Sequence, residues 1–411
     1  MSVRRPRLVF VSPLFLYPAD AGGKIRTTNI LRGLKGGAFE ITLLSPAAPG
    51  QAQTWRAEID GLCDHYLSWP APRPRPNWRR AFDLFDAIPA NVVPDRVQAA
   101  ITVVRGAVEA GAADLVVFDF VHSSVLKPER ATCKTLCFTH NVEAEIFARH
   151  AEQASDALRR RVWASQHAKM VRFEAHSLRG YDKVIAVSER DARHFASQYG
   201  VAGAEAIPTG VDLDYFAWQE MPGEASDVPT VVFTGSMDSA ANRDGVEFFL
   251  DAVWPQVAAA LPQARFVVVG RNPPPALVAR GRSQPGVDFT GFVDDVRPYL
   301  RSAQVSVIPL RVGGGTRIKA FEAMSSGSPV VSTALGVEGL EVEPGVHFLQ
   351  EDGAAGFAAA VIGLLRDADA RRRLARAART LVESRFGHRV AARAFEDICL
   401  RALHAAPAAG A

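Results

Sequence analysis

The chain has 411 residues, 48% of them hydrophobic and 22% charged, which is typical of a folded globular protein and excludes a disordered or fibrous one. Its 47 basic and 44 acidic residues are interspersed and leave a net charge of +3, so nucleic acid is not an expected partner. The four cysteines are too few and too scattered for a disulfide framework, and Cys133 and Cys137 have no second Cys or His at metal-ligand spacing. We therefore expect reduced thiols and a cytoplasmic location.

The N-terminus imitates a secretion signal. Arg4, Arg5 and Arg7 precede an apolar run, but Pro13 and Pro18 interrupt any helix there, and residues 8–11 are better explained as a buried strand. No run elsewhere approaches the ~18 apolar residues of a membrane-spanning helix. We expect a soluble protein, or one attached peripherally to the inner face of a membrane.

Short apolar runs alternate with amphipathic segments along the whole chain. Because most of these runs are continuously hydrophobic, they are typical of parallel strands covered on both faces. Predicted helices include residues 245–261, 295–302 and 316–326. The predicted strands are residues 8–12, 41–45, 115–119, 135–139 and 184–187, then 230–235, 265–270, 287–291, 304–309 and 329–333. The pattern occurs twice, so we expect an α/β protein with two doubly wound parallel sheets.

The seam between the two halves lies near residues 207–210 and the polar stretch 219–229. We expect an N-terminal domain at 1–210, a second domain at 211–385, and at 386–411 a C-terminal helix that packs back toward the N-terminal domain, followed by a tail. Residues 69–94 fit this scheme poorly, because prolines alternate with arginines before Trp78, Phe82 and Phe85. The simplest description is an extended proline-rich linker that begins at Trp69 and leads into a short basic amphipathic helix. Two interpretations stay open: contact with an anionic membrane surface or an anionic acceptor, or a solvated loop whose aromatic side chains pack back on the core.

The most informative stretch runs from Ile308 to Met324. A strand ends, Gly313, Gly314 and Gly315 follow, Thr316 can cap, and a helix begins with Arg317 and Lys319 in its first turn. Glycines allow close approach of a ligand, and a helix N-terminus offers unpaired N–H groups to an anion. Basic residues there oppose the helix dipole unless a polyanion binds. The pattern favours a phosphate site over a glycine-rich connection with solvated basic side chains, and it matches neither a Walker A loop nor a dinucleotide fingerprint.

This stretch, continued to Thr333, resembles the donor-binding core of retaining GT-B glycosyltransferases. The resemblance covers roughly residues 8 to 350 and is closest to the large group 1, or family 4, members that build exopolysaccharides and related surface glycans. It implies two Rossmann-like domains that face each other across a cleft. The other similar segments, in the order of the family, are Gly22-Gly23 with Arg26 and Asn29, then residues 184–189, 207–212, 232–237, 242–245, 266–270 and 289–294.

The resemblance implies a nucleotide-diphosphate sugar as donor and a glycan or lipid-linked acceptor, with transfer that retains anomeric configuration and needs no essential metal. Negative charge then develops on the departing diphosphate, and Arg317, Lys319 and helix N–H groups would stabilise it. We expect no metal site and no cofactor besides the donor. The residues expected to bind the donor are Gly22, Gly23, Gly235, Arg243, Phe292, Val293, Gly313, Gly314, Gly315, Thr316, Arg317, Lys319 and Glu322.

The sequence also departs from the family. Many relatives carry two glutamates seven residues apart; Glu322 matches the second, the expected ribose partner, but Gly314 stands where the first would lie beside the donor sugar. A basic pair that relatives often carry is replaced by Gly235-Ser236 and Asp244-Gly245, and Arg243 is a candidate substitute.

His140 follows a predicted strand, at a position where the family often has a histidine lining the cleft. Our candidate catalytic residues are His140, Arg317 and Lys319. A lone histidine is as compatible with a structural role, and Glu143 and Glu145 are alternatives for polar contact or the acidic start of a helix. We expect a glycosyltransferase acting in surface polysaccharide synthesis. The alternatives are a non-catalytic nucleotide-sugar-binding subunit and a GT-B-fold epimerase.

Overall fold

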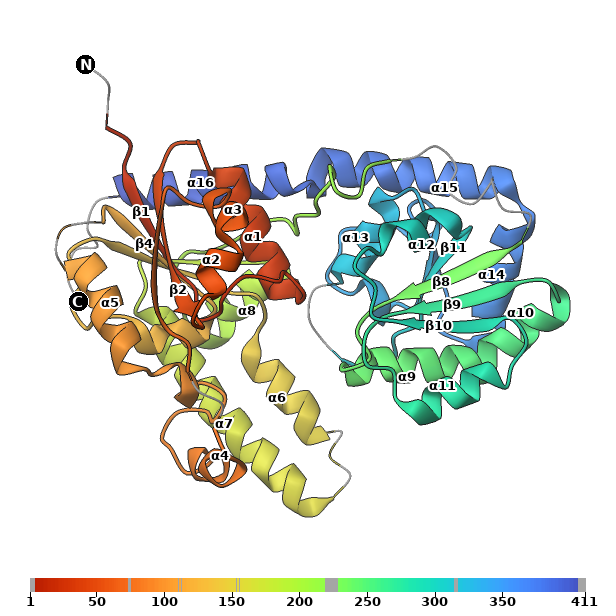
Figure 1. Ribbon diagram of the computed structural model, residues 1–411, viewed down its shortest axis with the longest axis horizontal. Coiled ribbons are helices and arrows are strands. Elements are labelled where there is room, and N and C mark those ends of the chain that lie inside the picture. The colour runs from red at the N-terminus through yellow and green to blue at the C-terminus, as the bar shows by residue number, and fades with distance from the viewer. Residues whose placement is uncertain are drawn as a thin grey trace. The chain divides into compact units, whose positions relative to one another are not determined.

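The computed structural model describes residues 4–72, 75–109, 111, 113–152, 154, 156–218, 228–313 and 317–405. The chain divides into two compact units. Unit 1 comprises residues 1–210 together with 388–411, and unit 2 comprises residues 211–387. Each unit contains one parallel β-sheet (Figure 1).

The sheet of unit 1 is seven-stranded and parallel throughout. Its order reverses beside the first strand, so that β1 lies between β2 and β4. From one edge to the other, the strands are β3 (His65–Pro70), β2 (Glu40–Ala47), β1 (Arg7–Val11), β4 (Leu115–Asp119), β5 (Lys134–Phe138), β6 (Lys183–Ala186) and β7 (Ala204–Ala206).

Both faces of this sheet are covered, because successive side chains of β1 enter two different cores. Leu8 and Phe10 pack with α1 and α16, whereas Val9 and Val11 pack on the opposite face with α5, α7 and α8. The helices of unit 1 are α1 (Gly22–Leu34), α2 (Gln51–Thr54), α3 (Arg56–Asp60), α4 (Asn77–Asp83), α5 (Gln98–Glu109), α6 (Glu143–Glu152), α7 (Ala157–Arg179), α8 (Glu189–Tyr199) and α16 (His388–His404), with the 3₁₀ turns η1 (Val93–Asp95) and η2 (Val121–Leu126).

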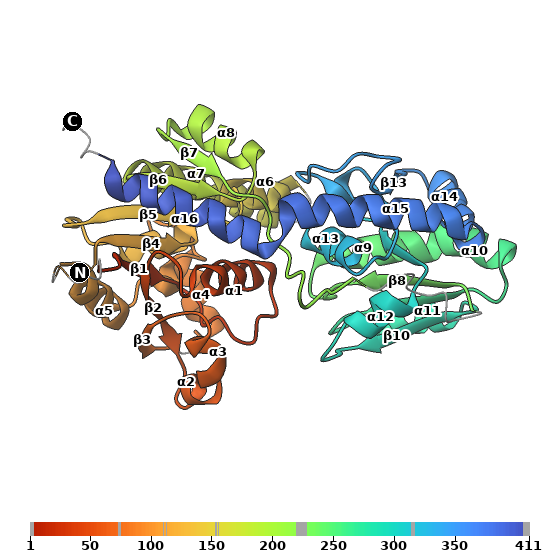
Figure 2. The ribbon, with the colours of Figure 1, turned by 90° about the horizontal axis from the view of Figure 1, so that it is seen from above.

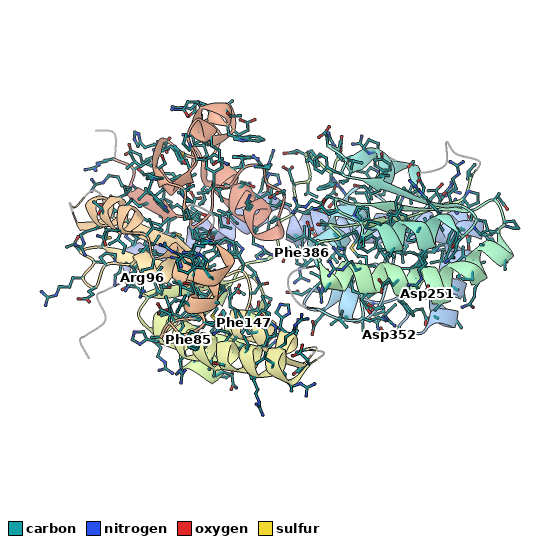
Figure 3. The ribbon with its side chains drawn as sticks, turned by 60° about the horizontal axis from the view of Figure 1, so that its bottom comes forward. Phe85, Arg96, Phe147, Asp251, Asp352 and Phe386 are labelled. Atoms are coloured by element: carbon teal, nitrogen blue, oxygen red, sulfur yellow. The ribbon has the colours of Figure 1, made fainter. Side chains whose placement is uncertain are left out.

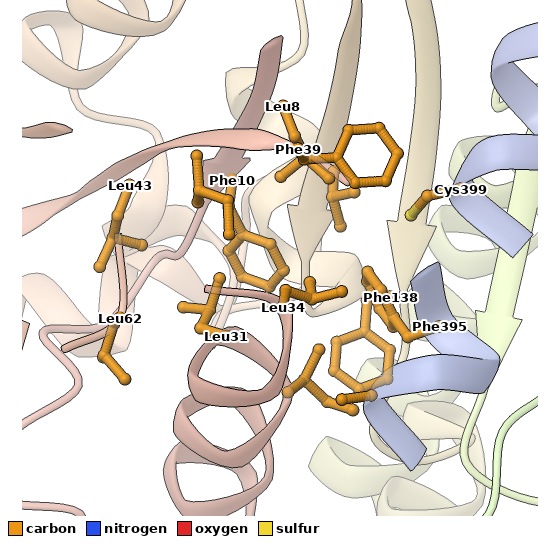
Figure 4. Packing of buried hydrophobic residues seen from close by; sticks show 14 of the residues in the cluster. Leu8, Phe10, Leu31, Leu34, Phe39, Leu43, Leu62, Phe138, Phe395 and Cys399 are labelled. Carbon is orange, nitrogen blue, oxygen red and sulfur yellow. The ribbon is translucent and has the colours of Figure 1, made fainter. Parts of the chain in front are cut away.

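The last helix of the chain completes the core of unit 1. Figures 1 and 2 show α16 beside α1, and the Phe395 ring lies 6.4 Å from that of Phe10 and 5.2 Å from that of Phe138. Phe395 and Cys399 are fully buried in this core (Figure 4). A segment more than 370 residues from β1 in the sequence therefore covers one face of the first sheet.

Unit 2 repeats this topology with six parallel strands. Their order is β10 (Val287–Gly291), β9 (Arg265–Val269), β8 (Thr230–Thr234), β11 (Val305–Ile308), β12 (Val330–Ser332) and β13 (Leu349–Gln350). The helices are α9 (Ala240–Phe248), α10 (Trp254–Ala260), α11 (Pro275–Arg282), α12 (Arg297–Ser302), α13 (Ile318–Ser325), α14 (Ala354–Arg366) and α15 (Ala368–Leu381), with the turns η3 (Phe249–Val253), η4 (Leu335–Val337) and η5 (Val382–Phe386).

The expectation of two doubly wound parallel sheets is confirmed, and all ten predicted strands are present. The three strands that were not predicted, β3, β7 and β13, lie at sheet edges, where a strand needs no continuous apolar run. Trp69 was expected to open a linker; instead it is buried in β3. Among the helices of the described residues, none has the length and apolar character required to cross a membrane.

Candidate functional site

Each sheet has one position where the strand order reverses, between β1 and β4 in unit 1 and between β8 and β11 in unit 2. In open α/β sheets, ligands bind at the carboxyl ends of the strands beside such a reversal. Lys319 of unit 2 lies beside Gly235 after β8, and His140 of unit 1 lies beside Asp119 at the end of β4, so both side chains are near a strand reversal.

In unit 2, Lys319 reaches from the first turn of α13 to the end of β8. Its Nζ donates a 2.7 Å hydrogen bond to Oδ1 of Asn242 and lies 4.5 Å from the centre of the Phe233 ring. Asn242 in turn donates to the carbonyl of Ser236 at 2.8 Å. A side chain at Gly235 would place its Cβ 2.8 Å from Lys319 Nζ, so glycine is needed there for the ammonium group to approach the backbone.

Lys319 and Glu322 have strongly shifted protonation equilibria. Burial lowers the pKa of Lys319 to about 7; Glu322 opposes this shift and Arg317 adds to it. Burial raises the pKa of Glu322 to about 7, against the effect of Lys319. No hydrogen bond to the Glu322 carboxylate comes from any of the described residues, so its oxygens remain available to a ligand.

Arg317 occupies the N-cap position of α13 and is only 5% exposed. Its guanidinium donates to the carbonyls of Leu335 at 3.0 Å and Gly313 at 3.2 Å, and it lies 4.0 Å from a carboxylate oxygen of Glu338. Gly313 has φ +98°, and a Cβ there would lie 2.7 Å from that of Ala241, so this position requires glycine. Gly314, Gly315 and Thr316 lie outside the described residues.

The remaining candidates of unit 2 lie around this centre. Arg243 donates to the carbonyls of Met237 at 2.5 Å and Asp238 at 3.0 Å. Beyond β10, the ring of Phe292 is 69% exposed, whereas Val293 packs against a buried core. Of the candidates in unit 2, the fold thus brings Gly235 and Lys319 into direct proximity. Within the described residues, the hydrogen bond of Lys319 goes to Asn242 and not to Phe292 or Val293.

In unit 1, the carboxylate of Asp119 is the centre of a buried polar group at the end of β4. Its Oδ2 accepts hydrogen bonds from Ser12 at 3.1 Å and Thr27 at 3.0 Å, and its Oδ1 accepts one from His140 at 2.7 Å. All four side chains are less than 5% exposed. We call Ser12, Thr27, Asp119 and His140, together with Arg26, the Asp119 cluster.

The partners of His140 determine its tautomer. A carboxylate only accepts, so Nε2 carries the proton, and Nδ1 accepts from Nη1 of Arg26 at 3.3 Å. Burial lowers the pKa of His140, although Asp119 opposes this shift, and the lowered pKa favours the neutral ring. Both ring nitrogens have protein partners in this structure.

Of the glycine pair Gly22-Gly23, Gly23 lies against the ring of Phe120, and Phe120 contacts the Asp119 cluster. A Cβ on Gly23 would lie 2.5 Å from the Phe120 ring, and that ring stacks on His140 with centroids 4.0 Å apart. Phe120 has φ +60° and ψ 145°, a conformation almost restricted to glycine that costs roughly 1–3 kcal/mol. Such strain is often found at binding sites. Gly22 begins α1, whose N-terminus no side chain caps.

A second cluster of titratable side chains in unit 1 surrounds His122. Its Nε2 lies 3.6 Å from a Glu143 oxygen and 3.2 Å from Asn91 Nδ2, and its Nδ1 lies 3.9 Å from an Asp95 oxygen. Burial raises the pKa of Asp95 to about 6, although His122 and Arg75 oppose this shift. Burial would lower the pKa of His122, but Glu143 and Asp95 outweigh it and raise that pKa.

An exposed aromatic surface is formed by α4 and the residues after it. Trp78, Phe82 and Phe85 are 59%, 68% and 84% exposed, and the Arg79 guanidinium lies 5.1 Å from the Trp78 ring centre. Figure 3 labels Phe85 and, nearby in sequence, Arg96, which pairs with Asp86 at 3.2 Å. The aromatic side chains of this α4 surface do not pack back on the core.

Several of these residues were not identified from the sequence. Asp119 ends an otherwise apolar strand, and such a buried charge is a recognisable signal. Phe120, His122 and Asn242 carry no comparable signal, because their importance arises from backbone strain or from contacts between distant segments.

Comparison with known proteins gives two family matches. Residues 21–215 match the family described as "Glycosyltransferase Family 4", and residues 228–367 match "Glycosyl transferases group 1". Phosphatidyl-myo-inositol mannosyltransferase of Mycolicibacterium smegmatis is 33% identical over 189 residues, which are 44% of this chain and 48% of that protein. The chain thus matches about half the length of this curated relative.

Similar solved structures cover nearly the whole chain. A sucrose-phosphate synthase from Thermosynechococcus elongatus has a TM-score of 0.69 at 19% identity, over 95% of this chain and 98% of that one. The Anabaena protein HepE, solved with UDP-glucose, has a TM-score of 0.67 at 14% identity, with 95% and 98% covered. At these identities the likeness establishes a common fold.

Proposed function

We propose that this chain, which belongs to the group 1 and family 4 glycosyltransferases of the GT-B fold, transfers a sugar from a nucleotide diphosphate to a glycan or lipid-linked acceptor. We further propose that transfer proceeds with retention and without an essential metal, in exopolysaccharide or other surface polysaccharide synthesis. The observation that carries the proposal is the placement of Lys319 beside Gly235 at the strand reversal of unit 2.

Lys319 fits the leaving diphosphate. Within the described residues its ammonium group donates one hydrogen bond, to a neutral amide, and burial has made its charge costly. A bound diphosphate would raise the pKa of Lys319, so that the cation becomes fully charged where negative charge develops as the glycosidic bond breaks. Arg317 holds the backbone at Gly313, and we assign it the role of shaping the glycine-rich segment beside this anion.

Glu322 fits a ribose. A carboxylate with no competing hydrogen bond from the described residues can accept from both hydroxyls of a vicinal diol. The exposed ring of Phe292 follows the end of the edge strand β10, two strands away from β8, and we place the nucleotide base there. Gly22, Gly23 and Arg243 remain proposed donor contacts.

We place the acceptor at unit 1, around His140 and the strand ends β4 and β5. Two of the compared proteins support these substrate classes by name: HepE was solved with UDP-glucose, and the mycobacterial relative is called a phosphatidyl-myo-inositol mannosyltransferase. For a lipid-linked acceptor, the α4 surface would supply contact with an anionic membrane from the cytoplasm.

The test is a thermal-shift screen with nucleotide diphosphates and their sugar conjugates, followed by acceptor-dependent transfer with the best donor. A shift for one base, larger with one sugar, and a product of retained configuration are expected. Arg317→Ala should weaken nucleotide diphosphate binding by roughly tenfold to hundredfold. Binding without turnover on any acceptor would favour a non-catalytic subunit, and nucleotide release without an acceptor product would favour an epimerase.

A further inference from the structure

A buried carboxylate of α7 holds the start of α6. Glu174 is completely buried, and its Oε1 accepts a 2.9 Å hydrogen bond from the backbone N–H of Glu143. Its Oε2 accepts one from the N–H of Ala144 at 3.2 Å and one from the hydroxyl of Tyr199 at 2.9 Å. Because Tyr199 belongs to α8, this one side chain connects the three helices α6, α7 and α8.

The start of α6 depends on Glu174 because the residue before the helix cannot cap it. The first N–H groups of a helix have no partner within the helix itself. Val142 precedes α6, and its side chain is buried and has no polar atom. Its backbone carbonyl accepts only the third of these groups, the N–H of Glu145, at 3.1 Å. The first two N–H groups of α6 therefore rely on a residue that lies 31 positions after Glu143 in the sequence.

A local cap would satisfy the same N–H groups at a lower cost. A serine, threonine, aspartate or asparagine directly before a helix accepts such bonds without a deeply buried charge. A fully buried carboxylate loses its hydration, and its hydrogen bonds only compensate for that loss. What the distant carboxylate adds is a defined position of the α6 start relative to α7 and α8.

The segment held in this way contains His140. Only residues 139–142 separate the end of β5 from Glu143, the first residue of α6. The other end of this segment is fixed at Thr139, whose N–H and hydroxyl both donate to the carbonyl of Ile185, at 2.9 Å and 3.1 Å. A displacement of the α6 start would therefore be taken up within these few residues, and it would move the ring of His140.

We propose that Glu174 is a positioning residue of the acceptor side, which fixes the start of α6 and thereby holds His140 and Glu143 in place. Glu174 acts through the backbone of α6 rather than by touching a substrate. This inference deepens the proposed function, on which its meaning for catalysis rests. A merely structural Glu174 would stabilise the packing of the three helices and leave the environment of His140 unchanged.

The experiment compares Glu174→Gln with Tyr199→Phe in the full chain. The amide of Glu174→Gln has one accepting oxygen, and its NH₂ group opposes a donor, so the hold on α6 is impaired. Tyr199→Phe removes only the third hydrogen bond and leaves both bonds to α6 intact. The readout is the imidazole ¹H–¹⁵N spectrum of protein labelled at histidine, in which the signals of His140 are identified by their absence from His140→Gln. Spectra are recorded at pH 8, because burial raises the pKa of Glu174 to about 7.

The His140 signals should shift in Glu174→Gln and stay at their wild-type positions in Tyr199→Phe, although both variants should have lower melting temperatures. Glu174→Asp keeps the charge but shortens its reach, so it should also shift these signals, and it serves if Glu174→Gln does not fold. Unchanged His140 signals in the Glu174 variants, or an equal shift in Tyr199→Phe, would make Glu174 structural and overturn the proposal.

A transfer assay tests the link to catalysis. The Glu174 variants should raise the acceptor KM roughly tenfold and leave the donor KM unchanged, whereas Tyr199→Phe should change neither. Equal effects of the Glu174 and Tyr199 variants on the acceptor KM would contradict the positioning role. The spectra need no turnover, so a failure of the transferase proposal would be seen separately.

Discussion

Lys319 Nζ donates to Oδ1 of Asn242 at 2.7 Å, and this contact joins the first turn of α13 to α9 at the end of β8. The neutral amide holds the ammonium group without neutralising it. Lys319 therefore differs from the surface lysine Lys183, whose ammonium group lies 2.6 Å from a Glu205 oxygen.

Nucleotide diphosphate binding should have a pH optimum near 7. Lys319 must be protonated and Glu322 ionised, and both have pKa values of about 7, so affinity should fall in either direction. Lys319→Met should remove the alkaline fall and weaken binding roughly tenfold to hundredfold at pH 7. Glu322→Gln should remove the acidic fall. Calorimetry from pH 5.5 to 8.5 measures both, with Lys183→Met as the control; parallel pH profiles in all four proteins would contradict the assignment.

Gly23→Ala should destabilise the protein through Phe120. The added Cβ would lie 2.5 Å from the ring, and the required shift should cost roughly 1–3 kcal/mol of unfolding free energy. Combining it with Phe120→Ala should recover most of this loss, as a double-mutant cycle in urea would reveal. Gly106→Ala is the control, because a Cβ added to this glycine of α5 would meet no atom within 4 Å. Strictly additive effects would show that the contact carries no coupling.

Asp95→Asn should stabilise the protein in alkaline solution. The folded-state pKa of Asp95, about 6, exceeds its unfolded value, so the folded protein binds more protons between these values and loses stability as the pH rises through them. The amide removes this penalty and should add roughly 1–3 kcal/mol at pH 8, but little at pH 4. The pKa of Glu143 shifts in the opposite direction to that of Asp95: burial would raise it, but His122 outweighs burial and lowers it, so the ionised carboxylate stabilises the folded protein. Glu143→Gln should destabilise at pH 8; equal effects of Asp95→Asn at both pH values would refute the shift.

Replacing the aromatic residues of the α4 surface by serine should weaken binding to anionic vesicles. Burial of Trp78, Phe82 and Phe85 in the interfacial region would contribute several kcal/mol, so the triple variant should bind at least roughly tenfold more weakly in co-sedimentation with phosphatidylglycerol vesicles. Leu67→Ser is the control, because Leu67 is also an exposed apolar residue of unit 1, at 49%. Wild-type protein that remains in the supernatant would contradict the membrane-contact interpretation.

The sequence was most informative where burial imposes a simple pattern. Central strands such as residues 115–119 are almost continuously apolar and were located to within a residue or two, whereas β3 (His65–Pro70) is mostly exposed at a sheet edge and was missed. Gly235 and Lys319 were both singled out from the sequence and lie close together, and their role in donor binding stays a prediction; the amide partner Asn242 depends on a fold contact across 77 residues. His140 was identified from the sequence as a candidate polar residue at a strand end. Its contacts with Asp119 and Arg26 were not predicted, because the three residues come from separate segments of the chain.

The position of α16 in unit 1 has a consequence for biosynthesis. Phe395 packs against Phe10 and Phe138, so the first hydrophobic core cannot be completed until the ribosome has produced all of unit 2 and then α16. Unit 2, which is continuous in sequence, can fold during that delay. Until α16 is made, the apolar side chains of the nascent first unit that it covers, Phe10 and Phe138 among them, lack this cover and are open to aggregation.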